Sequence, residues 1–189
     1  MTWWQNAENA ENFSVFFNRD DSKERSIAEP PAEFVTEAGT RFLMPTDPDA
    51  GGTWMFVNER GVVVTLLNWY DKAVPYAEKA SRFRSRGLLV KVLADVRDLG
   101  ELENRLVEAT EGAPYRPFHL FGFAPNSSPC GWRWDGESIS TIQQGKTMIS
   151  PPLISSSSFE KERVLRSRRD DFLALNPKTR EDFVAYQTN

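Results

Sequence analysis

The sequence has only one cysteine and one histidine among its 189 residues. A lone cysteine, Cys130, cannot form an intrachain disulfide, and its isolation suits a reducing compartment. One thiol and one imidazole are too few for the nitrogen and sulfur ligands of a typical zinc site. His119 lies inside the apolar run PFHLFGF, where we expect a half-buried structural histidine. The sequence therefore predicts no metal site and no other cofactor.

Basic residues are not in excess either, since the formal net charge is −4. A nucleic-acid surface normally shows the opposite balance. No apolar run approaches the roughly 20 residues that cross a bilayer. The opening MTWWQNAENAEN has neither the basic nor the apolar region of a signal peptide. We expect a cytoplasmic protein that binds neither nucleic acid nor membrane, and a hydrophobic fraction of 40% is enough for a folded core.

The first part of the chain favours strands joined by turns. The run FSVFFN (13–18) is apolar enough for a strand buried on both faces. Short alternating runs on either side of Gly39 indicate a hairpin. The clearest hairpin follows, with two β-rich runs, TWMFVN and VVVTLLNWY, joined at Glu59, Arg60 and Gly61.

Helical spacing appears next. Residues 77–94 predict a helix weakened by Gly87, and residues 99–110 predict an amphipathic helix with Leu99, Leu102, Leu106 and Val107 on one face. Strands return at 116–125, 130–136 and 138–143. A helix then runs to Asn176-Pro177, with Ser157 and Glu160 spaced as a capping box, and a short terminal helix follows.

Strands and helices are thus segregated along the chain, which favours α+β layers over alternating βαβ units. Two helical layers that enclose stacked antiparallel sheets fit this order. Neither an internal repeat nor a long linker divides the sequence, so we expect a single domain over residues 1–189.

Two polar groups of residues are candidates for a site. FFNRDD (16–21) ends an apolar run on Arg19, Asp20 and Asp21, which either converge on a site or form a solvated surface turn. Asn68 ends the run VVVTLL, where a buried amide needs hydrogen-bond partners. That amide either donates to a developing oxyanion or simply ends the strand.

These residues belong to three blocks that resemble the NRDE family, also called the transport and Golgi organisation protein 2 family. NRDD (18–21) is similar to its Asn-Arg-Asp-Glu motif, with Asp21 in place of the glutamate. AGGTWMFVNERGVVVTLLN (50–68) resembles its Gly-Gly-Thr-Trp block and the Leu-Thr-Asn that follows, with Leu67 in place of the threonine. SSSSFEKERVLRSRRDDF (155–172) resembles a serine run and arginine-rich helix near the end of bacterial members.

The resemblance implies a fold and a set of roles. The family is similar to the N-terminal-nucleophile hydrolases, whose α+β fold is a four-layer αββα sandwich with antiparallel sheets. By that likeness Arg19 and Asp21 orient the nucleophile and its amine, Asn68 donates to the oxyanion, and Asn58 lies in the hairpin turn. The resemblance places a second asparagine role near Ser156.

The nucleophile implied by the resemblance is the side chain of the mature N-terminal residue, with its own α-amino group as the base. Relatives typically open with Met-Cys, whereas this chain opens with Met-Thr-Trp-Trp. Three readings stay open: the cysteine lies upstream of an assigned start, Thr2 serves after removal of Met1, or the nucleophile is absent.

Three functions remain open from the sequence. The first is hydrolysis of a small amide or acyl substrate. The second is a non-catalytic carrier of an apolar ligand such as haem or a lipid-like molecule, for which His119, Met148 and Cys130 are conceivable haem ligands. The third is an interaction role for the charged helix at 160–175.

Overall fold

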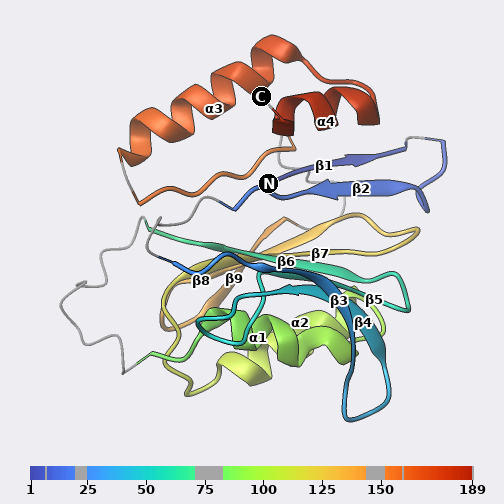
Figure 1. Cartoon of the computed structure of the whole chain (residues 1–189), viewed down its shortest axis with the longest axis vertical. Coiled ribbons are helices and arrows are strands. Elements are labelled where there is room, and N and C mark those ends of the chain that lie inside the picture. The colour runs from blue at the N-terminus through green and yellow to red at the C-terminus, as the bar shows by residue number, and fades with distance from the viewer. Residues whose placement is uncertain (7, 20–24, 71–82, 144–151, 159, 189) are drawn as a thin grey trace.

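The protein is a stack of four layers, helix on sheet on sheet on helix (Figure 1). The computed structural model describes residues 1–6, 8–19, 25–70, 83–143, 152–158 and 160–188. Helices α3 and α4 form one outer layer, and α1 and α2 form the other. Two antiparallel sheets of two and seven strands lie between them, which confirms the predicted α+β sandwich.

The elements follow the order that the sequence predicts, with strands first, then helices, then strands, then helices. Their bounds are β1 Thr2–Gln5, β2 Phe13–Phe16, β3 Glu29–Val35, β4 Arg41–Thr46, β5 Met55–Asn58, β6 Val63–Asn68, α1 Arg86–Val92, a 3-10 helix Leu93–Asp95, α2 Leu99–Thr110, β7 Phe118–Phe123, β8 Cys130–Trp134, β9 Ile139–Gln143, α3 Lys161–Leu175 and α4 Arg180–Thr188.

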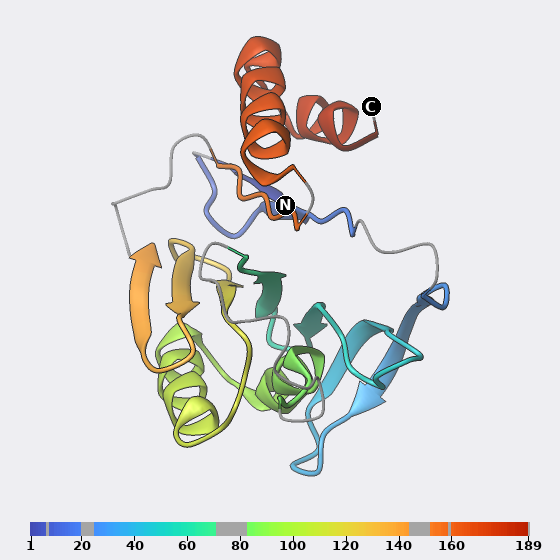
Figure 2. The same ribbon diagram turned by 90° about the vertical axis from the view of Figure 1, so that its left-hand side faces the viewer.

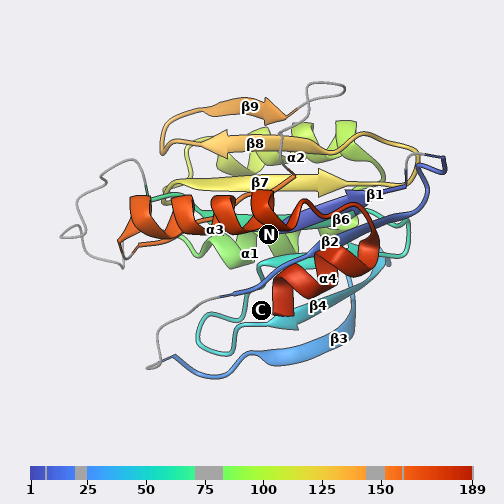
Figure 3. The same ribbon diagram turned by 90° about the horizontal axis from the view of Figure 1, so that it is seen from above.

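Each strand of the larger sheet pairs with its neighbour in sequence, in the order β3-β4-β5-β6-β7-β8-β9 (Figure 3). The two hairpins predicted in the first part of the chain are confirmed. Gly39 and Gly61 sit in their turns with φ of 88° and 77°, a left-handed conformation that glycine adopts without a steric penalty. Tight turns of this kind can be predicted from the sequence, because a single glycine marks each of them.

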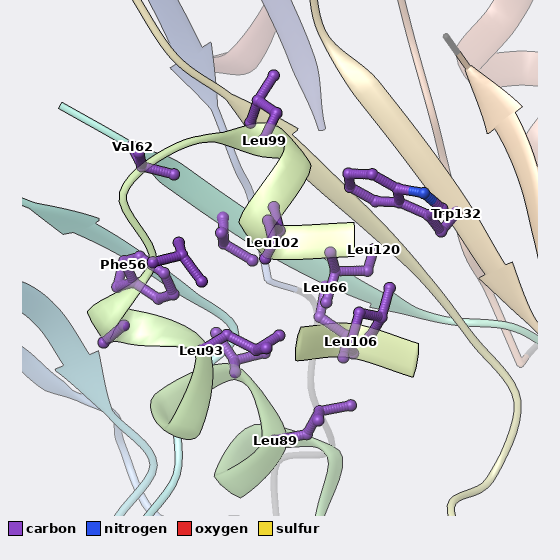
Figure 4. Close-up of a cluster of buried hydrophobic side chains, with 14 of the residues drawn as sticks. Phe56, Val62, Leu66, Leu89, Leu93, Leu99, Leu102, Leu106, Leu120 and Trp132 are labelled. Atoms are coloured by element: carbon purple, nitrogen blue, oxygen red, sulfur yellow. The ribbon is translucent and has the colours of Figure 1, made fainter. Parts of the chain in front are cut away.

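The larger core lies between the seven-stranded sheet and the layer of α1 and α2 (Figure 4). Leu102 and Leu106 of α2 are fully buried, and they face sheet residues such as Leu120 and Trp132. The β7–α2 contact is close, since a Cβ on Gly122 would lie 2.5 Å from Leu102 Cδ2. Glycine here lets the helix approach the sheet.

A smaller core joins the two sheets. Its buried members are Met1, Trp3, Leu67, Phe121 and Phe123. Odd-numbered residues of β1 face the larger sheet because side chains alternate along a strand. On the other side of β1 and β2, Phe16 stacks on Phe183 of α4 with 6.2 Å between ring centroids. Residues of β2 are half-buried, so the prediction of a strand fully buried on both faces was wrong.

Three local predictions were also wrong. Helix α1 begins only at Arg86, and residues 83–85 are not helical; residues 77–82 of the predicted helix lie outside the described residues. Val107 is 48% exposed and does not share the buried face of α2. The capping box of Ser157 and Glu160 does not form, because Glu160 is itself the N-cap residue, with φ of 39° and no side-chain cap hydrogen bond.

None of the helices in the described part of the chain is long and apolar enough to cross a membrane.

Candidate functional site

A cavity of about 790 Å³ opens where the N-terminus, the end of β6 and the start of α1 come together. Its wall also includes the residues after β2, the β4–β5 connection and residues 155–158, which run beneath α3 (Figure 2). The described residues that line a second hollow, of about 1030 Å³, are Glu160 and residues of α3. A single helix cannot enclose a ligand, so we place the candidate site in the first cavity.

Met1 lines this cavity and is itself buried. Its α-amino nitrogen donates a hydrogen bond to the carbonyl oxygen of Ile154 at 2.9 Å, and Ile154 N donates back to the Met1 carbonyl at 3.0 Å. Its sulfur accepts from the Thr65 hydroxyl at 2.9 Å. The first residue is thus fixed between β6 and the segment at 152–154, with its side chain toward the larger sheet.

Arg19 follows β2 and lines the same cavity. Its Nη2 lies 3.3 Å from Asp47 Oδ2, and its guanidinium carbon lies 4.6 Å from the centroid of the Trp54 ring. Arg25 also pairs with Asp47. A carboxylate and an aromatic face together hold the Arg19 side chain in place. Asp21, predicted to act with Arg19, lies outside the described residues.

Asn68 and Ser156 meet at the cavity wall. The Ser156 hydroxyl donates to the backbone carbonyl of Asn68, the last residue of β6. The Asn68 amide nitrogen donates to the Tyr70 hydroxyl at 2.8 Å. An amide nitrogen carries two N–H groups, so the Asn68 side chain has a second N–H donor besides the one that binds Tyr70. The structure therefore brings together Met1, Arg19, Asn68 and Ser156.

Thr2 is placed elsewhere. It is 0% exposed and is absent from the described cavity lining. Its hydroxyl oxygen accepts from Gln187 Nε2 of α4 at 2.8 Å. The alternation of β1 explains the difference, since Met1 and Trp3 face the larger sheet while Thr2 faces the helical layer. Of the predicted site residues that the structure describes, Thr2 alone lies apart from the cavity.

The sequence reasoning missed most of the cationic lining. Arg84, Arg86, Arg116 and Arg168 all contribute to the cavity wall. The signal was present as the basic run RFRSRG (82–87), which was read only as part of a helix. Arg116 and Arg168 gave no local signal, because they reach this wall through tertiary structure.

The two conceivable haem ligands that the structure describes, His119 and Cys130, do not line this cavity. His119 is buried in β7, where its Nε2 accepts from Arg133 Nε at 3.1 Å and its ring lies 5.5 Å from that of Trp69. Burial, and secondarily the charge of Arg133, lower the pKa of His119 to about 4, so the imidazole is neutral at pH 7. Neither His119 nor Cys130 is a lining residue, and Met148 lies outside the described residues.

Metal-ligating side chains are not clustered in the described part of the chain, where no three or more histidine, cysteine or acidic residues are placed to hold an ion.

Comparison with known protein families gives a match over most of the chain. The family model of transport and Golgi organisation 2 matches residues 1–184. No curated protein matches the chain. The family match extends over nearly all of the chain and includes every described residue that lines the cavity. The chain therefore belongs to the transport and Golgi organisation 2 family.

Proposed function

We propose that the cavity is the reaction site of an N-terminal-nucleophile type hydrolase, which acts on a small amide or acyl substrate. One observation carries the proposal: the first residue of the chain lines the same cavity as Arg19, Asn68 and Ser156. An N-terminal nucleophile requires this arrangement, because its side chain and its α-amino group must both reach the substrate.

The proposed reaction assigns a role to each group. The side chain of the N-terminal residue attacks the substrate carbonyl carbon, and its proton passes to its own α-amino group, whose ordinary pKa is about 8. That proton then moves to the leaving nitrogen or oxygen, and water cleaves the acyl-enzyme. The Asn68 amide donates to the oxyanion, while Arg19 and, outside the described residues, Asp21 orient the attacking residue.

The identity of position 1 limits this chemistry. A methionine thioether has no proton to lose and does not form a productive acyl-enzyme. Thr2 has a hydroxyl, but that hydroxyl points to α4. We therefore expect the chain with Met1 at its N-terminus to bind substrate without turning it over, whereas a thiol at position 1 should restore turnover.

The test is a Met1→Cys variant made behind an added initiator methionine that is removed on expression. We expect mass spectrometry to detect an acyl-enzyme with a panel of small amides and esters, and steady-state assays to detect release of the amine or alcohol. Adding Asn68→Ala to this variant should lower kcat by about 10²-fold, since one oxyanion donor is lost.

The unchanged chain is the matched control, because it contains the same Cys130 thiol but no thiol at position 1. Acylation of both proteins would report nonspecific thiol chemistry. A correctly processed Met1→Cys variant that folds and shows neither adduct nor turnover across the panel would refute the hydrolase proposal.

A further inference from the structure

Arginines dominate the charge of the described residues that line the cavity. Six of them line it: Arg19, Arg25, Arg84, Arg86, Arg116 and Arg168. Asp47 is the one carboxylate among the described lining residues. The chain as a whole carries a net charge of −4, so this concentration of positive charge runs against the overall balance. A concave surface lined by one sign of charge concentrates ligands of the opposite sign.

Three of the arginines share one wall. Arg84 N donates to the Pro114 carbonyl at 2.8 Å, and Arg84 forms a parallel bridge with Tyr115. Arg86 Nη1 donates to the Pro117 carbonyl at 2.9 Å. The residues before α1 and those before β7 therefore run side by side. This pairing brings Arg84, Arg86 and Arg116 to the same wall.

Aromatic rings support two of the guanidinium groups. The Arg116 guanidinium carbon lies 5.0 Å from the centroid of Phe83, as that of Arg19 lies over Trp54. Stacking against a ring fixes the plane of the guanidinium, and the N–H groups lie along the edge of that plane. This planar fork matches the oxygens of a carboxylate or a phosphate. Asp47 shows that arginines of this cavity bind a carboxylate, since its Oδ2 pairs with both Arg19 and Arg25.

We infer that the ligand of this cavity carries an anionic group, a carboxylate or a phosphate, bound by the wall that contains Arg84 and Arg116. The inference rests on the proposed function in treating the cavity as a substrate site, and it narrows the substrate class to anionic amides or acyl compounds. The scissile bond then lies toward Met1 and Asn68. A volume of about 790 Å³ is within the range of small-molecule sites.

The experiment measures binding to the unchanged chain by isothermal titration calorimetry at constant ionic strength. Succinate and inorganic phosphate are titrated separately, with succinamide as the neutral probe. We expect saturable binding of at least one anion and none of succinamide. If only succinate binds, the anionic group of the ligand is a carboxylate; if only phosphate binds, it is a phosphate. If both bind, the site recognises the anionic chemistry that the two groups share.

Variants locate the binding. We expect the double variant Arg84→Gln/Arg116→Gln to bind the anion at least tenfold more weakly than the unchanged chain. The double variant Arg84→Lys/Arg116→Lys should lose less affinity, because lysine keeps the positive charge and lacks only the planar guanidinium. Arg97→Gln is the matched control, since Arg97 is 73% exposed and pairs with Glu101 away from the cavity. Thermal unfolding of each variant verifies its fold.

The inference is overturned if neither anion binds the unchanged chain, or if Arg97→Gln weakens binding as much as the double variant does. It is likewise overturned if the Gln double variant is folded and binds unchanged. Because this measurement needs no turnover, anion binding with an inactive Met1→Cys variant would refute the hydrolase proposal alone. Turnover of neutral and anionic amides at equal kcat/KM would refute the anionic substrate alone.

Discussion

Asn58 illustrates what single residues contribute to this fold. Its amide nitrogen donates to the carbonyls of Ala94 and Val96 at 3.1 and 2.8 Å, and its side-chain oxygen accepts from Arg60 N and Val62 N at 3.1 and 3.0 Å. All four hydrogen bonds satisfy backbone groups at the junction of the β5–β6 turn and the 3-10 helix. The family resemblance implied a place for Asn58 at the hairpin, but its long-range partners depend on how the 3-10 helix packs.

The same distinction applies to the site residues. Asn68 was recognisable because an amide at the end of an apolar strand needs partners. The outward direction of Thr2 depends on the register of β1 against β2, in which Thr2 pairs with Phe16. Register is a tertiary property here, since a shift by one residue would exchange the faces of Thr2 and Met1.

His119 leads to a prediction about pH at the residue scale. Its pKa is about 4 in the folded protein, below an ordinary value of 6.5, so the unfolded chain binds the proton first. The stability that this difference contributes is fully present above pH 6.5 and is lost as pH falls toward 4. We expect the free energy of unfolding to decrease by about 3 kcal/mol across that window.

Urea unfolding between pH 7 and 5 measures this effect. The His119→Gln variant keeps an oxygen acceptor for Arg133 and has no imidazole, and His119 is the only histidine in the chain. Its unfolding free energy should therefore be nearly flat from pH 6.5 to 5. An unchanged slope in that variant would show that another group titrates.

Helix ends show why element boundaries were harder to predict than element types. Helix α4 is capped reciprocally: Asp182 N donates to Thr179 Oγ1 at 3.2 Å, and Asp182 Oδ2 accepts from Thr179 N at 2.8 Å. Backbone hydrogen bonds from Thr179 and Lys178, and a side-chain hydrogen bond from Thr179, lower the pKa of the Asp182 carboxyl group. Ser157 and Glu160 have capping-box spacing before α3, but no capping hydrogen bond forms there, because Glu160 adopts a left-handed conformation. A capping pattern forms only where the preceding chain can enter from the right direction.

Packing of α2 against β7 gives a prediction at the scale of elements. Gly122→Ala would place a Cβ 2.5 Å from Leu102 Cδ2 and 2.9 Å from Leu99 Cδ2. We expect a loss of about 1–3 kcal/mol in the free energy of unfolding, because a buried helix must shift to admit one methyl group. Chemical denaturation of the purified variant measures it.

The matched background is Leu102→Ala, which removes the atom nearest to the added Cβ. In that background Gly122→Ala should cost clearly less than it does in the unchanged chain, since both changes share one space. Equal costs in the two backgrounds would mean that the helix–strand contact is not close.

At the scale of the whole molecule, the order of the layers could be predicted from the sequence. The contacts that join the N-terminus to residues 152–154, and so close the stack of layers, could not. Segregated strands and helices indicated α+β layers with stacked antiparallel sheets, and the family resemblance implied the same four-layer sandwich. Closure depends on residues 152–154 returning to the N-terminus, where Leu153 forms a bridge with Thr2. Contacts between residues about 150 positions apart leave no periodic signal in the sequence, as the Met1–Ile154 hydrogen bond shows with a separation of 153.

The two cores differ in size, which leads to the last prediction. The outer layers of β1, β2, α3 and α4 rest on the smaller core, in which Trp3 is 2% exposed and lies 5.8 Å from both Phe121 and Phe123. Trp3→Ala should cost about 3–5 kcal/mol. We expect hydrogen exchange by mass spectrometry to show α3 and α4 losing protection before β6 and β7, because the larger core is left intact.

The matched change in that larger core, Trp134→Ala, removes a tryptophan that is 5% exposed and should lower protection in β6 and β7 as well. Equal loss of protection in all layers of the Trp3→Ala variant would show instead that the four layers unfold as one cooperative unit.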